Sequence, residues 1–124
     1  MHLSIIFCLL FSMTAWGADE NAQVKEVFAR YQKMHSEAKK DLVPQVFSEK
    51  YLADRGGESE VKASITKMPV PAYDLDIKPG AMSKDVKIVK MIPKGHKGHV
   101  QNLFILKRRP SGEWRIDGTM SNDD

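Results

Sequence analysis

The spacing of the apolar residues changes once along this chain, and that change limits what the chain can fold into. From Val24 to Met68 apolar residues recur every three or four positions, which is typical of helices that bury one stripe. From Ala72 onward they alternate with polar residues, which is typical of strands with one buried face. The order predicts a single α+β domain in which N-terminal helices pack on a four-stranded antiparallel sheet.

Three helical segments are expected before the change. The first carries the stripe from Val24 to Ala38, and a shorter one begins at Asp41 and stops at Gly56 and Gly57. A third stops before Pro69, because proline excludes the helical conformation from the residue before it. Its apolar stripe is Val61, Ile65 and Met68.

Four strands follow, at about 73–78, 85–92, 99–108 and 113–120, and Pro- and Gly-containing loops join them. Pairing like with like places Ile88 opposite Phe104 and, in the last hairpin, Leu106 opposite Ile116. The side of the sheet that faces the helices is then predicted to carry Tyr73, Leu75, Ile77, Val86, Ile88, Ile92, Val100, Phe104, Leu106, Trp114 and Ile116.

The other side of the predicted sheet is also apolar at its centre. An apolar patch with a charged rim indicates a surface for a partner or a homodimer. The alternative is a loop or C-terminal segment that folds over the patch. The candidate partner face consists of Val89, Met91, Leu103 and Ile105, with Lys87, Lys107 and Arg115 in its rim.

Residues 1–17 contain no Lys, Arg, Asp or Glu. The apolar run inside them has the length of a signal-peptide core and is too short to span a bilayer. We expect cleavage near Gly17, one domain over 18–120 and a polar tail over 121–124; a buried N-terminal helix is the alternative. The protein is then secreted or periplasmic, and nucleic acid is not an expected partner. The one cysteine, Cys8, lies in the leader, which excludes disulfides and Cys-ligated zinc from the mature domain.

Positive charge is concentrated in the strand region. Nine basic residues lie between Lys84 and Arg115 against two acidic ones, which gives +7, whereas the whole chain carries +3. Such a segment attracts anionic partners, which outside the cytoplasm are lipid head groups, cell-wall polymers, polysaccharides or an acidic protein. Alternatively, the lysines protect the sheet against edge-to-edge aggregation.

The order of the elements and their local patterns resemble the nuclear transport factor two-like superfamily over roughly residues 21–119. The resemblance implies that the sheet curves into a cone around the long helix and encloses a pocket. That pocket binds ligands, or holds the active site in the isomerase and dehydratase branches, and members often dimerise through the sheet. A cystatin-type fold is the competing architecture. The patterns are Val27-Phe28 to Tyr31, Val46-Phe47-Ser48, Tyr51-Leu52 and Trp114-Arg115-Ile116-Asp117-Gly118.

Few residues indicate chemistry. Candidate pocket residues are Tyr31, His35, Tyr73 and Trp114, and no catalytic residue or cofactor is assigned. Among carboxylates, Asp74, Asp76 and Asp117 are candidates for acid–base work, although the strand pattern favours solvated positions for the first two. His96 and His99 could share a metal ion, but two ligands are too few for a structural zinc site, so a solvated loop is favoured.

The sequence therefore predicts an exported, non-catalytic binding domain. It would recognise a small ligand through the pocket, or an anionic or protein partner through the basic sheet face. Two alternatives remain open: a small-molecule enzyme of the isomerase or hydratase class, and an exported inhibitor or immunity-type protein.

Overall fold

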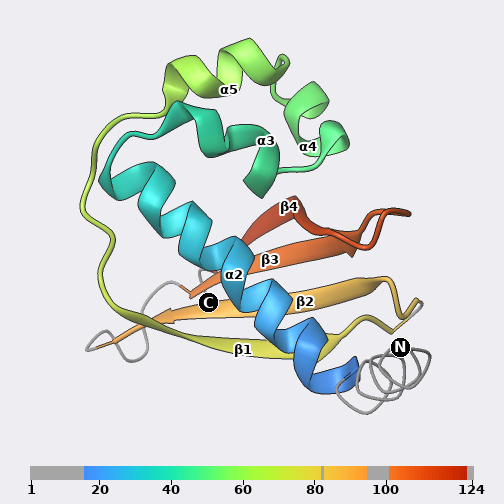
Figure 1. The fold of residues 1–124 in the computed structure, drawn as a ribbon. Coiled ribbons are helices and arrows are strands. Elements are labelled where there is room, and N and C mark those ends of the chain that lie inside the picture. The colour runs from blue at the N-terminus through green and yellow to red at the C-terminus, as the bar shows by residue number, and fades with distance from the viewer. Residues whose placement is uncertain (1–15, 82, 95–100, 123–124) are drawn as a thin grey trace, which may run out of the picture.

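A computed structural model describes residues 16–81, 83–94 and 101–122 of the protein. Helices come first and a four-stranded antiparallel sheet follows, which confirms the predicted α+β class. The long helix α2 (Trp16–Ser36) lies across one face of the sheet, and the shorter helices gather beyond its C-terminal end (Figure 1). Most of the predicted leader, residues 1–15, lies outside the described part of the chain.

The second helical segment is broken into short pieces. These are the 3-10 turn η1 (Lys40–Leu42), helix α3 (Val43–Val46) and helix α4 (Glu49–Asp54). Pro44 stands in the first turn of α3, where a missing N–H is tolerated. Phe47 and Ser48 then adopt extended conformations, so the chain turns before α4 begins.

The third helix, α5 (Glu58–Ser64), ends earlier than the sequence predicts. Val61 and Ile65 are buried, but Ile65 is already extended and Met68 is 46% exposed. The backbone N–H of Met68 donates to the carbonyl of His35 (2.9 Å). The chain after α5 therefore bonds to the end of α2 instead of continuing as a helix, and the prediction for Met68 is wrong.

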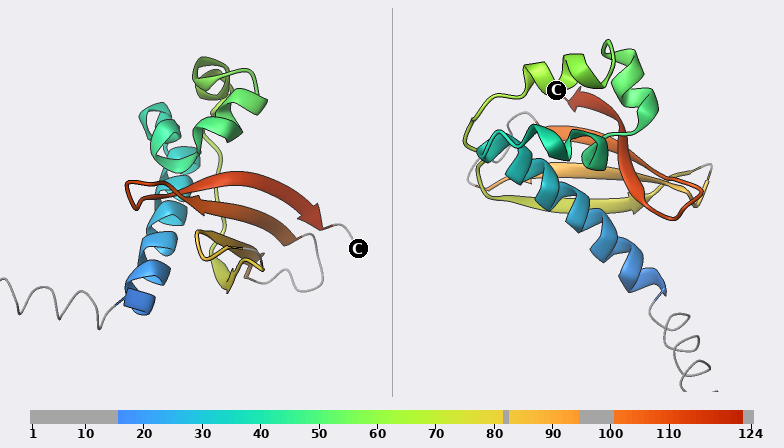
Figure 2. Two further views of the ribbon diagram at one scale, coloured as in Figure 1. Left: turned by 90° about the vertical axis from the view of Figure 1, so that its right-hand side faces the viewer. Right: turned by 45° about the horizontal axis from the view of Figure 1, so that its top comes forward.

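The sheet is a meander with the strand order β1-β2-β3-β4, and it is curved without closing into a barrel (Figure 2). Between Ile105 and Leu106 of β3 the pairing shifts, because β4 has one extra residue, Asp117, at that point. Such a bulge increases the bend and twist of a strand pair. β4 also reaches two residues into the predicted tail. The strands are β1 (Tyr73–Pro79), β2 (Val86–Pro93), β3 (Gln101–Arg108) and β4 (Trp114–Asn122).

The predicted register between β2 and β3 is wrong by one residue. Val89, not Ile88, pairs with Phe104, so the side of β2 that faces the helices is the reverse of the one predicted. The physical reason is the position of the lysines. The predicted inner side would place Lys90 in the middle of the core, whereas Lys87 on the actual inner side lies at the strand end, where it reaches Glu20.

The last hairpin has the predicted register, with Leu106 opposite Ile116. The outer edge of β4 is covered, because Phe47 forms a parallel bridge to Ile116 and the N–H of Ser48 donates to its carbonyl (2.9 Å). The helices and the inner side of the sheet enclose one core. Its buried members are Val24, Val27, Phe28, Met34, Val43, Val46, Phe47, Leu52, Val61, Ile65, Val89, Met91, Phe104, Leu106, Trp114 and Ile116.

Candidate ligand-binding site

A cavity of about 690 Å³ lies between the helices and the inner side of β3 and β4. Its lining residues come from α2, from α4 and α5 with the residues beside them, and from β3 and β4, the elements labelled in Figure 1. The size is in the range of small-molecule sites. The lining residues are Tyr31, His35, Phe47, Tyr51, Arg55, Glu60, Val61, Ser64, Ile65, Met68, Asn102, Phe104, Thr119 and Met120.

Ser48 fixes the helix that forms one cavity wall. Its hydroxyl oxygen accepts a hydrogen bond from the N–H of Tyr51 (3.1 Å) and so caps the N-terminus of α4. The same hydroxyl donates to Asp117 Oδ1 (2.7 Å) on β4. Because Asp117 is the extra residue of the bulge, this contact ties α4 to the bulge of β4.

Aromatic rings line the inner part of the cavity. The ring of Tyr31 lies 5.6 Å from that of Phe104 and 4.7 Å from the imidazole of His35, in both cases edge to face. Phe47 and Tyr51 stack with their planes nearly parallel, 4.2 Å apart. These rings offer a largely apolar surface with hydroxyl and imidazole groups at defined places.

Burial shifts the pKa of two titratable groups in the cavity, His35 and Tyr31, whereas Arg55 and Glu60 bring a cationic and an acidic side chain to the same lining. Burial lowers the pKa of His35, so its imidazole is neutral. Burial, followed by the neighbouring Tyr51 and Tyr73, raises the pKa of Tyr31. His35 Nδ1 is buried without a hydrogen-bond partner among the described residues, which leaves Nε2 as the ring nitrogen available to a ligand. His35 and Tyr31 therefore offer neutral donors and acceptors beside the ionic side chains of Arg55 and Glu60.

The predicted pocket residues divide into two pairs. Tyr31 and His35 line the cavity. Tyr73 lies outside it, because its hydroxyl donates to the carbonyl of Phe28 (3.0 Å) on α2. Trp114 is also outside it, with its side chain fully buried in the core at the other end of the sheet.

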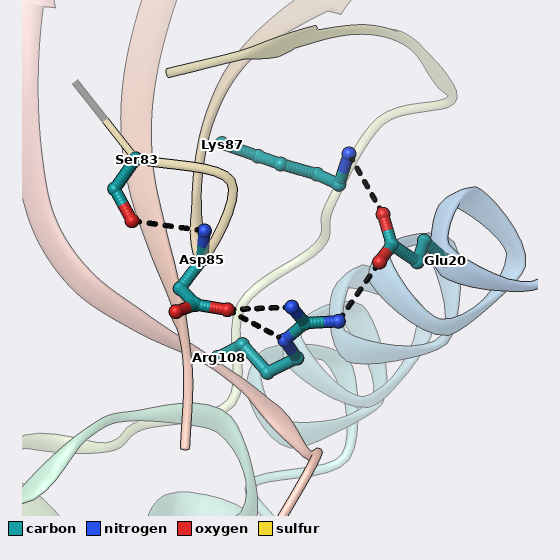
Figure 3. A network of polar contacts seen from close by, with 5 residues as sticks. All are labelled: Glu20, Ser83, Asp85, Lys87 and Arg108. Atoms are coloured by element: carbon teal, nitrogen blue, oxygen red, sulfur yellow. Dashed lines mark hydrogen bonds and ion pairs between the residues drawn. The ribbon is translucent and has the colours of Figure 1, made fainter. Parts of the chain in front are cut away.

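The residues around Trp114 form a charged network (Figure 3). Glu20, near the start of α2, bridges Lys87 Nζ (3.4 Å) and Arg108 Nη1 (2.8 Å). Asp85 accepts from Arg108 Nε (2.9 Å), and both cations lie 5.5 Å from the ring centre of Trp114. The network joins α2 to β2 and β3 and uses the charges of Lys87 and Arg108 within the fold.

The predicted partner face needs correction at four of its residues. Val89 and Met91 are in the core because of the register of β2, and Lys87 belongs to the charged network. Arg115 is 8% exposed, and its guanidinium donates to the carbonyl of Pro44 (3.0 Å). The members left on the outer side are Leu103, Ile105 and Lys107, and a homodimer through this side stays a prediction.

Five cations of the positive segment form ion pairs with described residues, and three of their acidic partners, Glu20, Glu49 and Asp74, come from other parts of the fold. Asp85 and Glu113 belong to the segment itself and are already counted in its charge of +7. The ion pairs are Lys87 with Glu20, Lys94 with Asp74, Arg108 with Glu20 and Asp85, Arg109 with Glu49, and Arg115 with Glu113.

The remaining candidates do not converge on the cavity. Asp74 and Asp76 point to the outer side and pair with Lys94 and Lys78, at 3.8 and 3.7 Å. Within the described residues, no group of three or more His, Cys, Asp or Glu could hold a metal ion, and the predicted pair His96 and His99 lies outside them.

None of the helices described here combines the length and apolarity that a membrane span needs.

Sequence reasoning missed Tyr51 and Arg55 as cavity residues. Their spacing of four places them on one side of α4, and Gly56 and Gly57 directly after Arg55 mark the helix end. The glycine pair was interpreted only as a helix boundary, although the four-residue spacing of Tyr51 and Arg55 could have pointed to their shared side.

Comparison with protein-family models, curated proteins and solved structures finds no match for this chain.

Proposed function

We propose that the protein is an exported, non-catalytic binding domain of the nuclear transport factor two-like type, which holds a small and partly apolar molecule in the cavity between α2, α4, α5 and the sheet. The observation that carries the proposal is a cavity of about 690 Å³ whose inner part is aromatic and carries the neutral side chains of Tyr31 and His35. Export is inferred from the uncharged, apolar residues 1–17.

Two features favour binding over catalysis of the isomerase or hydratase type. A general base needs a group that orients it, usually a carboxylate within hydrogen-bond distance. In the described structure no carboxylate bonds to the side chain of His35 or Tyr31. The candidate carboxylate Asp117, two residues before the lining residue Thr119, accepts a hydrogen bond from Ser48 instead.

The cavity also has more support than the basic sheet face. Lys87 and Arg115, two of the three cations predicted for that face, are 12% and 9% exposed at their side chains and are already paired within the fold. Only Lys107 of the three is exposed.

A thermal-shift screen with small aromatic and aliphatic molecules tests the proposal. A ligand present at 100 times its dissociation constant stabilises the folded state by about 2.7 kcal/mol, which is a readily measured shift. Ser64→Trp should abolish the shift because Ser64 lines the cavity, whereas Ser59→Trp, on the same helix and outside the lining, should keep it. Absence of any hit, or hits that persist in Ser64→Trp, would count against the cavity as the binding site.

A further inference from the structure

Arg55 occupies an unusual position at the rim of the cavity. It is the C-cap residue of α4, and its guanidinium carbon lies 3.6 Å from the ring centre of Tyr51. Phe47 stacks on Tyr51 at 4.2 Å with nearly parallel planes. Both neighbours lie directly over the ring, so they must contact its opposite faces, and Tyr51 is sandwiched between a buried ring and a guanidinium.

This stack holds the guanidinium in place while most of its hydrogen-bonding capacity stays unused. Arginine carries five N–H donors in a planar fork. Nη2 donates to the hydroxyl of Thr119 over a long 3.4 Å, and Arg55 takes part in no ion pair with another described residue. Glu60 lines the same cavity but is not within ion-pair distance of Arg55. A preorganised cation with free parallel donors is the arrangement that recognises carboxylates.

The charge and the shape of the cavity restrict the ligand further. Arg55 is the single cationic side chain in the described lining, since the neutral His35 adds no charge. One guanidinium matches a carboxylate monoanion better than a phosphate dianion. The lining is exposed at Arg55 and is buried and apolar at Val61 and Phe104, and Tyr31 packs against the same core. A ligand with an anionic head and an apolar body fits this gradient.

We propose that Arg55 binds the carboxylate of a small organic acid whose apolar body lies against Tyr31, Val61 and Phe104. This inference rests on the proposed binding function of the cavity and specifies the class of ligand. Arg55 acts as the specificity-determining residue, because the apolar walls alone would accept a neutral molecule of the same shape.

Isothermal titration with 1-naphthaleneacetate and its neutral amide, 1-naphthaleneacetamide, tests the inference. The two probes share size and ring system and differ in charge. The wild-type protein should bind the acid about tenfold more tightly than the amide, the difference expected for a charged hydrogen bond. Arg55→Gln should lower the affinity for the acid about tenfold and leave that for the amide unchanged.

Two further variants separate charge, geometry and folding. Arg55→Lys keeps the charge but loses the planar fork, so it should recover only part of the affinity for the acid. Lys50 lies on the same helix, pairs with Asp54 and does not line the cavity. The Lys50→Gln variant should therefore bind the acid as the wild type does. The far-UV circular dichroism of each variant shows whether it is folded.

The outcomes distinguish this inference from the proposed function. Equal affinities for acid and amide, or an unchanged affinity in Arg55→Gln, would overturn the role of Arg55 while the cavity remains a binding site. If neither probe binds to the wild type, the role of Arg55 is overturned, whereas the proposed binding function fails only if the thermal-shift screen also gives no hit. If Lys50→Gln weakens binding as much as Arg55→Gln does, the effect is one of general charge and the specific role is refuted.

Discussion

Ser48 is the residue on which the wall of the cavity depends most, and Ser48→Ala tests that dependence. The hydroxyl caps α4 by accepting from the N–H of Tyr51 and donates to the carboxylate of Asp117. Alanine removes both bonds and leaves the backbone bond from residue 48 to Ile116 intact. The perturbation therefore acts on the attachment of α4 and not on the pairing of the edge of β4.

The magnitude follows from the two bonds. Loss of an N-cap side chain costs about 1 kcal/mol. A hydrogen bond to a charged acceptor contributes about 1.5–3 kcal/mol when buried, but Asp117 is half-exposed and water replaces part of it, so we assign about 1 kcal/mol. The free energy of unfolding should fall by about 2 kcal/mol, which corresponds to roughly 10 °C in Tm for a domain of this size.

Urea unfolding followed by far-UV circular dichroism measures this change. A double-mutant cycle with Asp117→Ala isolates the contact between the two side chains, and the coupling energy should be about 1 kcal/mol. Ser59→Ala replaces an exposed serine of α5 and should stay within about 0.5 kcal/mol of the wild type. A change below 0.5 kcal/mol in Ser48→Ala, or a cycle without coupling, would refute the reasoning.

Two further predictions concern burial. Burial lowers the pKa of His35, so the unfolded chain binds more protons than the folded one as the pH falls through about 6.5. The free energy of unfolding, measured with urea at each pH, should therefore drop from pH 7.5 to 5, and it should drop less steeply in His35→Gln. Parallel curves of this free energy against pH for the two proteins would contradict the prediction. Val89→Asp puts an unpaired charge in the core and should lower the free energy of unfolding by roughly 3–5 kcal/mol. Ile88→Asp, on the outer side, should lower it clearly less. The reverse order of stability in thermal melts would contradict the register.

The class of fold could be predicted because two periods dominate different halves of the chain. The stripe of α2 contains Val24, Val27, Phe28 and Met34, and each of these is buried. In the last hairpin the predicted register, with Leu106 opposite Ile116, is confirmed. Local pattern is sufficient where one side of an element is clearly apolar and the other clearly polar.

β2 shows why the same reasoning failed elsewhere. Both of its sides carry aliphatic residues and a lysine, so the pattern alone does not select the inner one. The choice depends on Glu20, which lies far away in sequence and accepts an ion pair from Lys87. On the other side Lys90 stands directly opposite Asp76 of β1. The register thus depends on where each lysine lies in the folded sheet, with Lys87 beside Glu20 and Lys90 on the outer side, and that is a property of the folded chain.

The cavity itself follows from breaks in the helical region that the sequence reasoning treated only as boundaries. The segment from Asp41 to Leu52 is not one continuous helix. Pro44 instead begins a single turn, and the extended Phe47 and Ser48 pair with the edge of β4 before α4 turns away. Tyr51 and Arg55 are thereby held over the cavity and not in the core. Because Ser48 makes both the turn and its bond to Asp117, the opening of the cavity and the stability of α4 should change together.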